Sequence, residues 1–314
     1  MPAVSTGVVT PRHREISWTD EEKYCTALEV YADKIIVGWN NGEIKIYNSA
    51  SLNCEMVLNY YTSKVTCLQC PGTEIIAGYE DGVICVWNIE TEDLMMSHPV
   101  SAASSGRNFL TCMTFRDPAL LVGCVLNDGV LIWRYVNSSF TYVNSWDAGE
   151  NHIQDVDFNE NYIVLRPRGV PQPVHVHDFN GQRLRTIFPH SGTFQMALYG
   201  NQLVTSDRRG VLQIWDICRG RFLKELLRAE IYVFSLDAHN GVIATASPGG
   251  GVIVWSMQEV LGGSQDQLAV LSINNEIKCV TFDVDLWEIK LGPNVLVARS
   301  SERDYQRKIF VTYF

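Results

Sequence analysis

Short apolar runs and polar breaks alternate along the whole chain of 314 residues. The stretch "IIAGYEDGVICVWN" (75–88) shows the unit, because two apolar runs flank Glu80-Asp81-Gly82 and the second run closes on Trp87. A polar break of this kind predicts a β-hairpin, since Asp and Gly suit tight turns. Val, Ile and aromatic residues are frequent throughout, as strands require. The pattern therefore predicts a protein built from short strands.

The hairpin recurs at a regular spacing. Its copies close on Tyr47, Trp87, Trp133, Trp215 and Trp255, which are 40, 46, 82 and 40 residues apart. The gap of 82 predicts a degenerate copy at residues 163–179, with His177 in place of the aromatic residue, and a last copy occupies residues 295–314. A period of about 40 residues is typical of the four-stranded blades of β-propellers.

Each hairpin has an apolar strand before it, and another strand follows the hairpins ahead of the last one, for example at residues 54–59 and 221–227. The sequence therefore predicts an all-β, seven-bladed β-propeller with four antiparallel strands per blade. One domain is expected over residues 1–314. The blades are expected at residues 24–60, 64–97, 109–146, 153–188, 193–228, 231–271 and 276–314, with "IKCVTF" (277–282) as the inner strand of the last blade. Residues 13–18, "HREISW", are expected to supply the outer strand of that blade and to close the ring, which removes an open sheet edge.

The hairpins that end at Trp87, Trp215 and Trp255, together with the Trp215-Asp216 pair, resemble the WD-repeat β-propeller family over residues 24–314. The copies are degenerate, and the family's Gly-His pair before the inner strand is absent. The short turns between the first two strands further resemble the propellers of F-box/WD-repeat ubiquitin-ligase receptors, although no F-box is expected in residues 1–23. The resemblance implies an interaction scaffold and, in its most specific form, a substrate receptor.

Composition and charge narrow the classes of partner. The net charge of −10 argues against a general nucleic-acid binder, which would need a positive field over much of its surface. No apolar run approaches the roughly 18–20 residues of a membrane span, so no membrane insertion is expected. No secretory signal is visible, and the nine cysteines are irregularly spaced. These features predict a cytoplasmic or nuclear protein.

Three candidate chemical sites have simpler structural interpretations. Cys67 and Cys70 have the spacing of a zinc or redox pair, but residues three apart in a strand face opposite sides. His175 and His177 share one strand face, without a third ligand near them in the sequence. Glu80-Asp81 occupies a position that holds turn residues in the other copies. We therefore expect no enzyme activity, no metal and no cofactor.

The turns between the second and third strands are expected to emerge together at one end of the ring. They are amide or acidic in the first three blades and rich in arginine in blades four, five and seven. Arginine suits bidentate capture of a carboxylate or phosphate, and exposed aromatic residues can anchor a partner. The predicted partner-binding residues are Arg166, Arg168, Arg208, Arg209, Arg299, Arg303, Tyr79 and Trp39.

The leading hypothesis is a non-catalytic scaffold that binds a protein or phosphopeptide at this end of the ring, as a monomer within a larger complex. A constitutive structural subunit of a multiprotein complex is the alternative. A propeller enzyme is the third class, and it would need acidic or histidine residues that converge from the inner strands, for which the repeats show no regular set.

Overall fold

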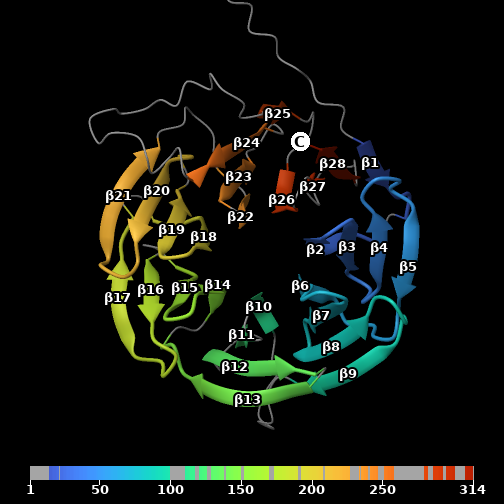
Figure 1. The fold of residues 1–314 in the computed structure, drawn as a ribbon, viewed down its shortest axis with the longest axis horizontal. Helices are drawn as coiled ribbons and strands as arrows, with labels where there is room; N and C mark the ends of the chain where they lie inside the picture. Colours follow the sequence, from blue (N-terminus) through green and yellow to red (C-terminus); the bar gives the residue numbers. More distant parts are fainter. Residues whose placement is uncertain are drawn as a thin grey trace, which may run out of the picture.

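A computed structural model describes residues 14–20, 22–99, 110–116, 120–125, 129–137, 139–149, 152–169, 173–189, 192–207, 209–226, 233, 235–239, 241–246, 251–257, 279–281, 286–292, 295–300 and 308–313. These residues form seven antiparallel four-stranded sheets, arranged like blades in a ring (Figure 1). In each sheet we name the strands a to d from the centre of the ring outwards.

Six of the sheets are built from four strands that follow one another along the chain. Blade one consists of β2 (Cys25–Tyr31), β3 (Lys34–Trp39), β4 (Ile44–Asn48) and β5 (Cys54–Leu58). Blade two consists of β6 (Val65–Gln69), β7 (Glu74–Tyr79), β8 (Val83–Asn88) and β9 (Leu94–Pro99). Blade three consists of β10 (Leu110–Arg116), β11 (Leu120–Val125), β12 (Gly129–Val136) and β13 (Ser139–Trp146).

The same order continues on the other side of the ring. Blade four consists of β14 (Ile153–Phe158), β15 (Ile163–Pro167), β16 (Val174–His177) and β17 (Arg183–Ile187). Blade five consists of β18 (Gln195–Tyr199), β19 (Gln202–Ser206), β20 (Leu212–Asp216) and β21 (Arg221–Leu226). Blade six consists of β22 (Ser235–His239), β23 (Val242–Ala246), β24 (Gly251–Ser256) and β25 (Cys279–Thr281).

The remaining sheet, blade seven, joins the two ends of the chain. It consists of β26 (Leu286–Leu291), β27 (Val295–Ser300), β28 (Lys308–Tyr313) and the N-terminal strand β1 (Arg14–Ser17). Strand β1 pairs antiparallel with β28, with Arg14 opposite Val311. Arg14 also donates to the carbonyl oxygens of Ala50 and Ser51, in the turn between strands c and d of blade one. The N-terminal segment therefore completes blade seven and ties it to blade one.

The fold prediction was wrong in its account of the last two blades. Residues 279–281 form the outer strand of blade six, whereas residues 277–282 were expected to be the inner strand of blade seven. The inner strand of blade seven is β26, which was not predicted. Among the described residues, six sheets are therefore built from strands that are consecutive in the chain, and the last sheet is assembled from three C-terminal strands and β1.

The hydrophobic core lies in layers between neighbouring blades. Ile76 and Val86 of blade two, for example, pack in one cluster with Leu110 and Trp133 of blade three. A Cβ atom at Gly78 would overlap Leu110, so glycine allows the two blades to approach closely at this point. Because both faces of a middle strand are covered in this way, such strands read as continuous apolar runs instead of alternating with polar residues.

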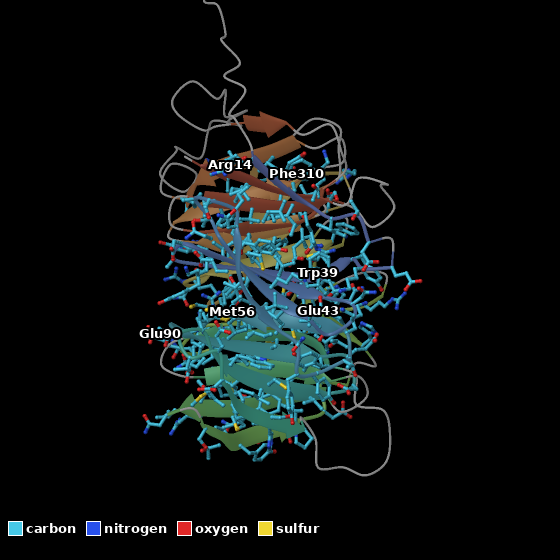
Figure 2. All side chains as sticks on the ribbon, turned by 90° about the vertical axis from the view of Figure 1, so that its right-hand side faces the viewer. Arg14, Trp39, Glu43, Met56, Glu90 and Phe310 are labelled. Carbon is cyan, nitrogen blue, oxygen red and sulfur yellow. The ribbon has the colours of Figure 1, made fainter. Side chains whose placement is uncertain are left out.

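The turns leave the ring at two opposite ends. In Figure 2, Trp39 and Glu43, beside the turn between strands b and c of blade one, lie toward one side, and Glu90, in the c–d turn of blade two, lies at the other. We call the end with the b–c turns the b–c face. No helix in the described part of the chain is long and apolar enough to cross a membrane.

Candidate functional site

The inner strands surround a channel with a volume of about 590 Å³. Side chains alternate along each inner strand, so that one set packs between blades and the other set lines the channel. In each of the seven blades, one equivalent position of the inner strand pairs with a buried apolar residue of strand b. Its occupants, in blade order, are Glu29, Gln69, Thr114, Asp157, Ala197, Asp237 and Lys290. The channel wall is therefore polar and carries charges of both signs.

Lys290 lies at the centre of the acidic part of this wall. Its Nζ atom is 3.7 Å from Oε2 of Glu29, and Glu29, Asp237, Glu288 and Asp155 together raise the pKa of Lys290, Glu29 most strongly. Burial raises the pKa of Glu29, and Lys290 opposes that shift. The lysine therefore stays charged and holds neighbouring carboxylates together across the interface between blades seven and one.

A second charged group closes the end of the channel away from the b–c face. Arg116 at the end of β10 makes a bidentate ion pair with Asp157, with N–O distances of 2.7–2.9 Å, and also donates to the Leu198 carbonyl at 3.1 Å. The Leu198 backbone N–H donates in turn to Asp157 Oδ2 at 2.9 Å. These contacts link blades three, four and five.

Arg166 and Arg299 occupy the same position of strand b in blades four and seven, each opposite a carboxylate of strand a. Both line the channel near the b–c face and are only 6% exposed. Arg299 donates from Nε to Glu288 Oε2 at 2.7 Å and from Nη1 to the Cys25 carbonyl at 2.9 Å. These two predicted residues therefore belong to the channel mouth and not to the outer rim.

The corresponding pair in blade four is looser. Arg166 donates from Nη1 to Gln154 Oε1 at 2.9 Å, but its Nη2 is 3.7 Å from Asp155 Oδ2, and its buried Nε has no acceptor among the described residues. Burial raises the pKa of Asp155 to about 6, and Arg166 offsets part of the shift. The Asp155 carboxyl group is thus poorly paired at neutral pH.

Arg168 and Arg209 are the predicted arginines that the structure leaves exposed on the b–c face. The Arg168 backbone donates to the His152 carbonyl at 2.9 Å, and burial together with the Arg168 charge lowers the pKa of His152. The Arg209 side chain is 68% exposed and donates from Nε to Asp207 at 3.1 Å. Arg208 and Arg303 lie outside the described residues.

The two aromatic residues predicted as partner anchors are buried. Trp39 is 1% exposed and packs edge-on against Trp18, with ring centroids 4.7 Å apart. Tyr79 is fully buried and packs against Tyr61 at 4.8 Å. Each is the last residue of a b strand and therefore lies inside the sheet before the turn begins. Neither ring offers the exposed surface that the sequence analysis expected.

The other sequence candidates show no reactive arrangement. No group of three or more His, Cys, Asp or Glu side chains suited to a metal ion occurs among the residues described. Burial raises the pKa of Cys67 to about 12, which keeps the thiol protonated and unreactive. His177 lies in β16 and stacks on Trp146, with ring centroids 6.3 Å apart.

Sequence reasoning missed the charged residues of the channel, chiefly Glu29, Asp237, Glu288 and Lys290. The signal was present in part, since Glu29 and Asp237 interrupt the apolar inner strands "TALEV" and "VFSLD". Glu288 and Lys290 were missed because strand β26 itself was not recognised.

One sequence relative and three solved structures are similar to this chain. No protein-family profile matches the chain. It is 20% identical over 242 residues to a "p21-activated protein kinase-interacting protein 1-like" protein of Gallus gallus, covering 74% of this chain and 63% of the relative's length. Solved structures of U3-55K and of the RRP9 WD40 repeats match 96% and 95% of the chain, and 98% and 97% of their own, each at 14% identity and a TM-score of 0.73. The computationally designed Ika8 protein matches 95% of this chain and 98% of its own at 15% identity and a TM-score of 0.65.

These similarities agree with the geometry of the ring. The chain has the fold of the WD40-repeat β-propellers. At 14–15% identity the structural matches show the fold alone.

Proposed function

We propose that this protein is a non-catalytic interaction scaffold whose b–c face binds an acidic or phosphorylated segment of a partner protein. The observation that supports this function best is the exposure of Arg168 and Arg209 on the neighbouring blades four and five. Both lie at b–c turns, at the end of the ring where Arg166 lines the channel mouth. The face thus combines exposed and buried guanidinium groups.

The charge of this region favours an acidic ligand. Among the residues that the structure describes, Arg209 pairs with one carboxylate, that of Asp207. An ion pair at an exposed arginine contributes little, so a ligand carboxylate or phosphate can compete for the guanidinium group. Arginine binds both groups in a bidentate manner. Screening limits electrostatic interactions to about 8–10 Å in physiological salt, so a local basic area can act despite the net charge of −10.

The channel geometry favours a scaffold over an enzyme. Two of its carboxylates are held in structural contacts, with Asp157 bound by Arg116 and Glu288 bound by Arg299. A general acid and base would need carboxyl groups turned toward a substrate site. The more specific hypothesis of a ubiquitin-ligase substrate receptor rests only on the resemblance of the short turns between strands a and b.

Charge reversal of the exposed arginines tests the proposal. The Arg168→Glu/Arg209→Glu variant should bind fluorescent acidic peptides that contain no aromatic residue, with and without phosphoserine, at least about tenfold more weakly than the wild type, because each bound anion loses a partner and meets a like charge. Binding is measured by fluorescence anisotropy with the full-length chain. The Arg134→Glu variant is the control, because Arg134 is exposed near the c–d turn of blade three.

Equal affinities of the wild type and the double variant for both peptides would overturn the proposal. If the variant also retained all the protein partners captured by the wild type from a cell extract, a constitutive subunit would be the better description.

A further inference from the structure

A second concentration of positive charge lies on the outside of the ring, away from the b–c face. The outer strands β17 and β21 follow one another along the edge of blades four and five (Figure 1). With the c–d turn of blade five they carry five basic residues and one acidic residue, and a second acidic residue ends strand β20 just before the turn. We call the basic set the basic wall, and it consists of Arg183, Arg185, Arg219, Arg221 and Lys224; the acidic residues are Asp216 and Glu225.

The corresponding surface of blades one and two has the opposite charge. Strands β5 and β9 and the c–d turn of blade two contain no lysine or arginine, and their acidic residues are Glu55, Glu90, Glu92 and Asp93. In Figure 2, Glu90 lies at the end of the ring opposite the b–c face. Outer strands and c–d turns are therefore not basic as a rule, and the basic wall is a local feature of blades four and five.

Three arginines of the basic wall meet at the c–d turn of blade five. Gly220 lies between Arg219 and Arg221 and has a φ of +62°, and a Cβ atom there would come within 3.0 Å of Arg185 Cδ. The glycine therefore gives the turn its left-handed backbone and leaves space for the Arg185 side chain from blade four. The Arg185 side chain of blade four therefore lies against the turn of blade five that carries Arg219 and Arg221.

These arginines have few partners within the protein. Arg219 pairs with Asp216 at 3.2 Å, and its side chain is 73% exposed. Arg185 and Arg221 form no hydrogen bond or ion pair with any residue that the structure describes. Arg14, which meets the c–d turn of blade one in the same way, instead donates to two backbone carbonyls. Arg14 thus ties two blades together, whereas the guanidinium groups of Arg185 and Arg221 remain available to a ligand.

An apolar contact lies beside the arginines. Phe222 is 41% exposed, and its ring is held edge-on against Trp215 with centroids 5.3 Å apart. A rigid aromatic ring next to arginine is the combination enriched in protein interfaces.

We propose that the basic wall is a second docking surface, which binds an acidic segment of a partner protein with an apolar residue that packs on Phe222. Charge complementarity favours an acidic protein segment over a nucleic acid or a second copy of this chain. A nucleic acid would need a basic track along its backbone, but Arg185, Arg219 and Arg221 lie around one turn, which is flanked by Asp216 and Glu225. A second copy of this chain would bring two molecules of net charge −10 together.

The test compares charge reversals on the two surfaces. The probe is a fluorescent peptide of Glu and Asp residues with two phenylalanines, used with the full-length chain in about 0.1 M salt. The Arg219→Glu/Arg221→Glu variant should bind it at least about tenfold more weakly than the wild type. The Arg134→Glu variant is the control, because this exposed side chain belongs to neither surface, and it should retain at least half of the wild-type affinity for this peptide. The Arg168→Glu/Arg209→Glu variant is measured in parallel and separates binding at the b–c face from binding at the basic wall.

A charge-neutral variant and a measurement of melting temperature separate an effect on binding from an effect on folding. The Arg219→Gln/Arg221→Gln variant should show an intermediate affinity, and all variants should keep the wild-type melting temperature because the changed side chains are exposed.

Unchanged peptide binding by the Arg219→Glu/Arg221→Glu variant would overturn the inference. So would loss of binding only in the Arg168→Glu/Arg209→Glu variant, a result that would still support the proposed b–c function. Binding of a single-stranded RNA but not of the peptide, or a wall-dependent dimer in sedimentation, would also contradict it.

Discussion

Blades four and seven place an arginine at the same position of strand b, opposite a carboxylate of strand a, yet the two pairs have different geometry. The Arg299–Glu288 contact is 2.7 Å, and Arg299 also binds the Cys25 carbonyl of blade one. The nearest contact between Arg166 and Asp155 is 3.7 Å. Aspartate is one methylene shorter than glutamate, so its carboxylate reaches less far toward the arginine. The tight pair lies where blade seven meets blade one and the ring closes, and the loose pair lies in an uninterrupted part of the chain.

The comparison shows how one position can serve two purposes. A buried ion pair stabilises only if its geometry is good and its remaining donors are satisfied. Arg299 meets that condition with two short hydrogen bonds and acts as a tie between blades. Arg166 does not, and it leaves the channel mouth with an arginine that is incompletely paired.

The largest effect is expected from removing the tight pair. Replacing Arg299 by Met should lower the free energy of unfolding by about 3–5 kcal/mol, because the partly buried Glu288 carboxylate loses its hydrogen-bonded cation and the Cys25 carbonyl loses a donor. Urea denaturation followed by tryptophan fluorescence measures this change. Arg168→Met is the exposed control and should change the free energy of unfolding by less than about 0.5 kcal/mol. A loss at position 299 no larger than in the control would contradict the role of Arg299 as a tie.

A smaller effect is expected at the equivalent residue of blade four. Arg166→Met should cost about 1–2 kcal/mol at pH 7, chiefly from the lost hydrogen bond to Gln154 and the burial of Asp155 without its cation. Because Asp155 already titrates near pH 6, it can take up a proton instead of remaining charged. The same denaturation experiment should therefore show a smaller loss at pH 5 than at pH 7. A loss equal to that of Arg299→Met would remove the distinction between the two pairs.

The smallest effect concerns pH dependence. The pKa of Asp155 is raised in the folded protein from 3.8 to about 6, so the native state binds this proton more tightly than the unfolded state does. Its contribution to stability is therefore fully present below about pH 4 and is lost as the pH rises to about 6. Asp155→Asn should remove this decline, which we expect to be about 1 kcal/mol because the side chain is partly exposed. Unfolding curves collected across this pH range measure the difference, and parallel pH profiles for wild type and variant would contradict it.

The repeat could be predicted from the sequence because a hairpin needs only a local pattern. The copies that close on Trp87, Trp133 and Trp215 lie in the expected strands β8, β12 and β20. Strand β26 was missed for a physical reason. Its polar residues Glu288 and Lys290 face the channel, whereas "IKCVTF" (277–282) has the apolar pattern of a core strand and was assigned in its place.

The site was predicted less well than the strands. The sequence predicted that arginines gather on blades four, five and seven, but it could not separate Arg168 and Arg209, which are exposed, from Arg166 and Arg299, which are buried. Trp39 and Tyr79 stand next to polar turn residues and look like rim residues. The strand register places both inside the sheet, where neighbouring aromatic rings cover them.

The sequence alone determined the all-β class, the period of the repeat and the turn positions, because these depend on contacts between near neighbours in the chain. The tertiary structure decided how the last sheet is assembled and which charged side chains share a site. Those outcomes depend on residues far apart in the sequence, such as Arg299 and Cys25, or Arg185 and Gly220, which become neighbours only when the ring is complete.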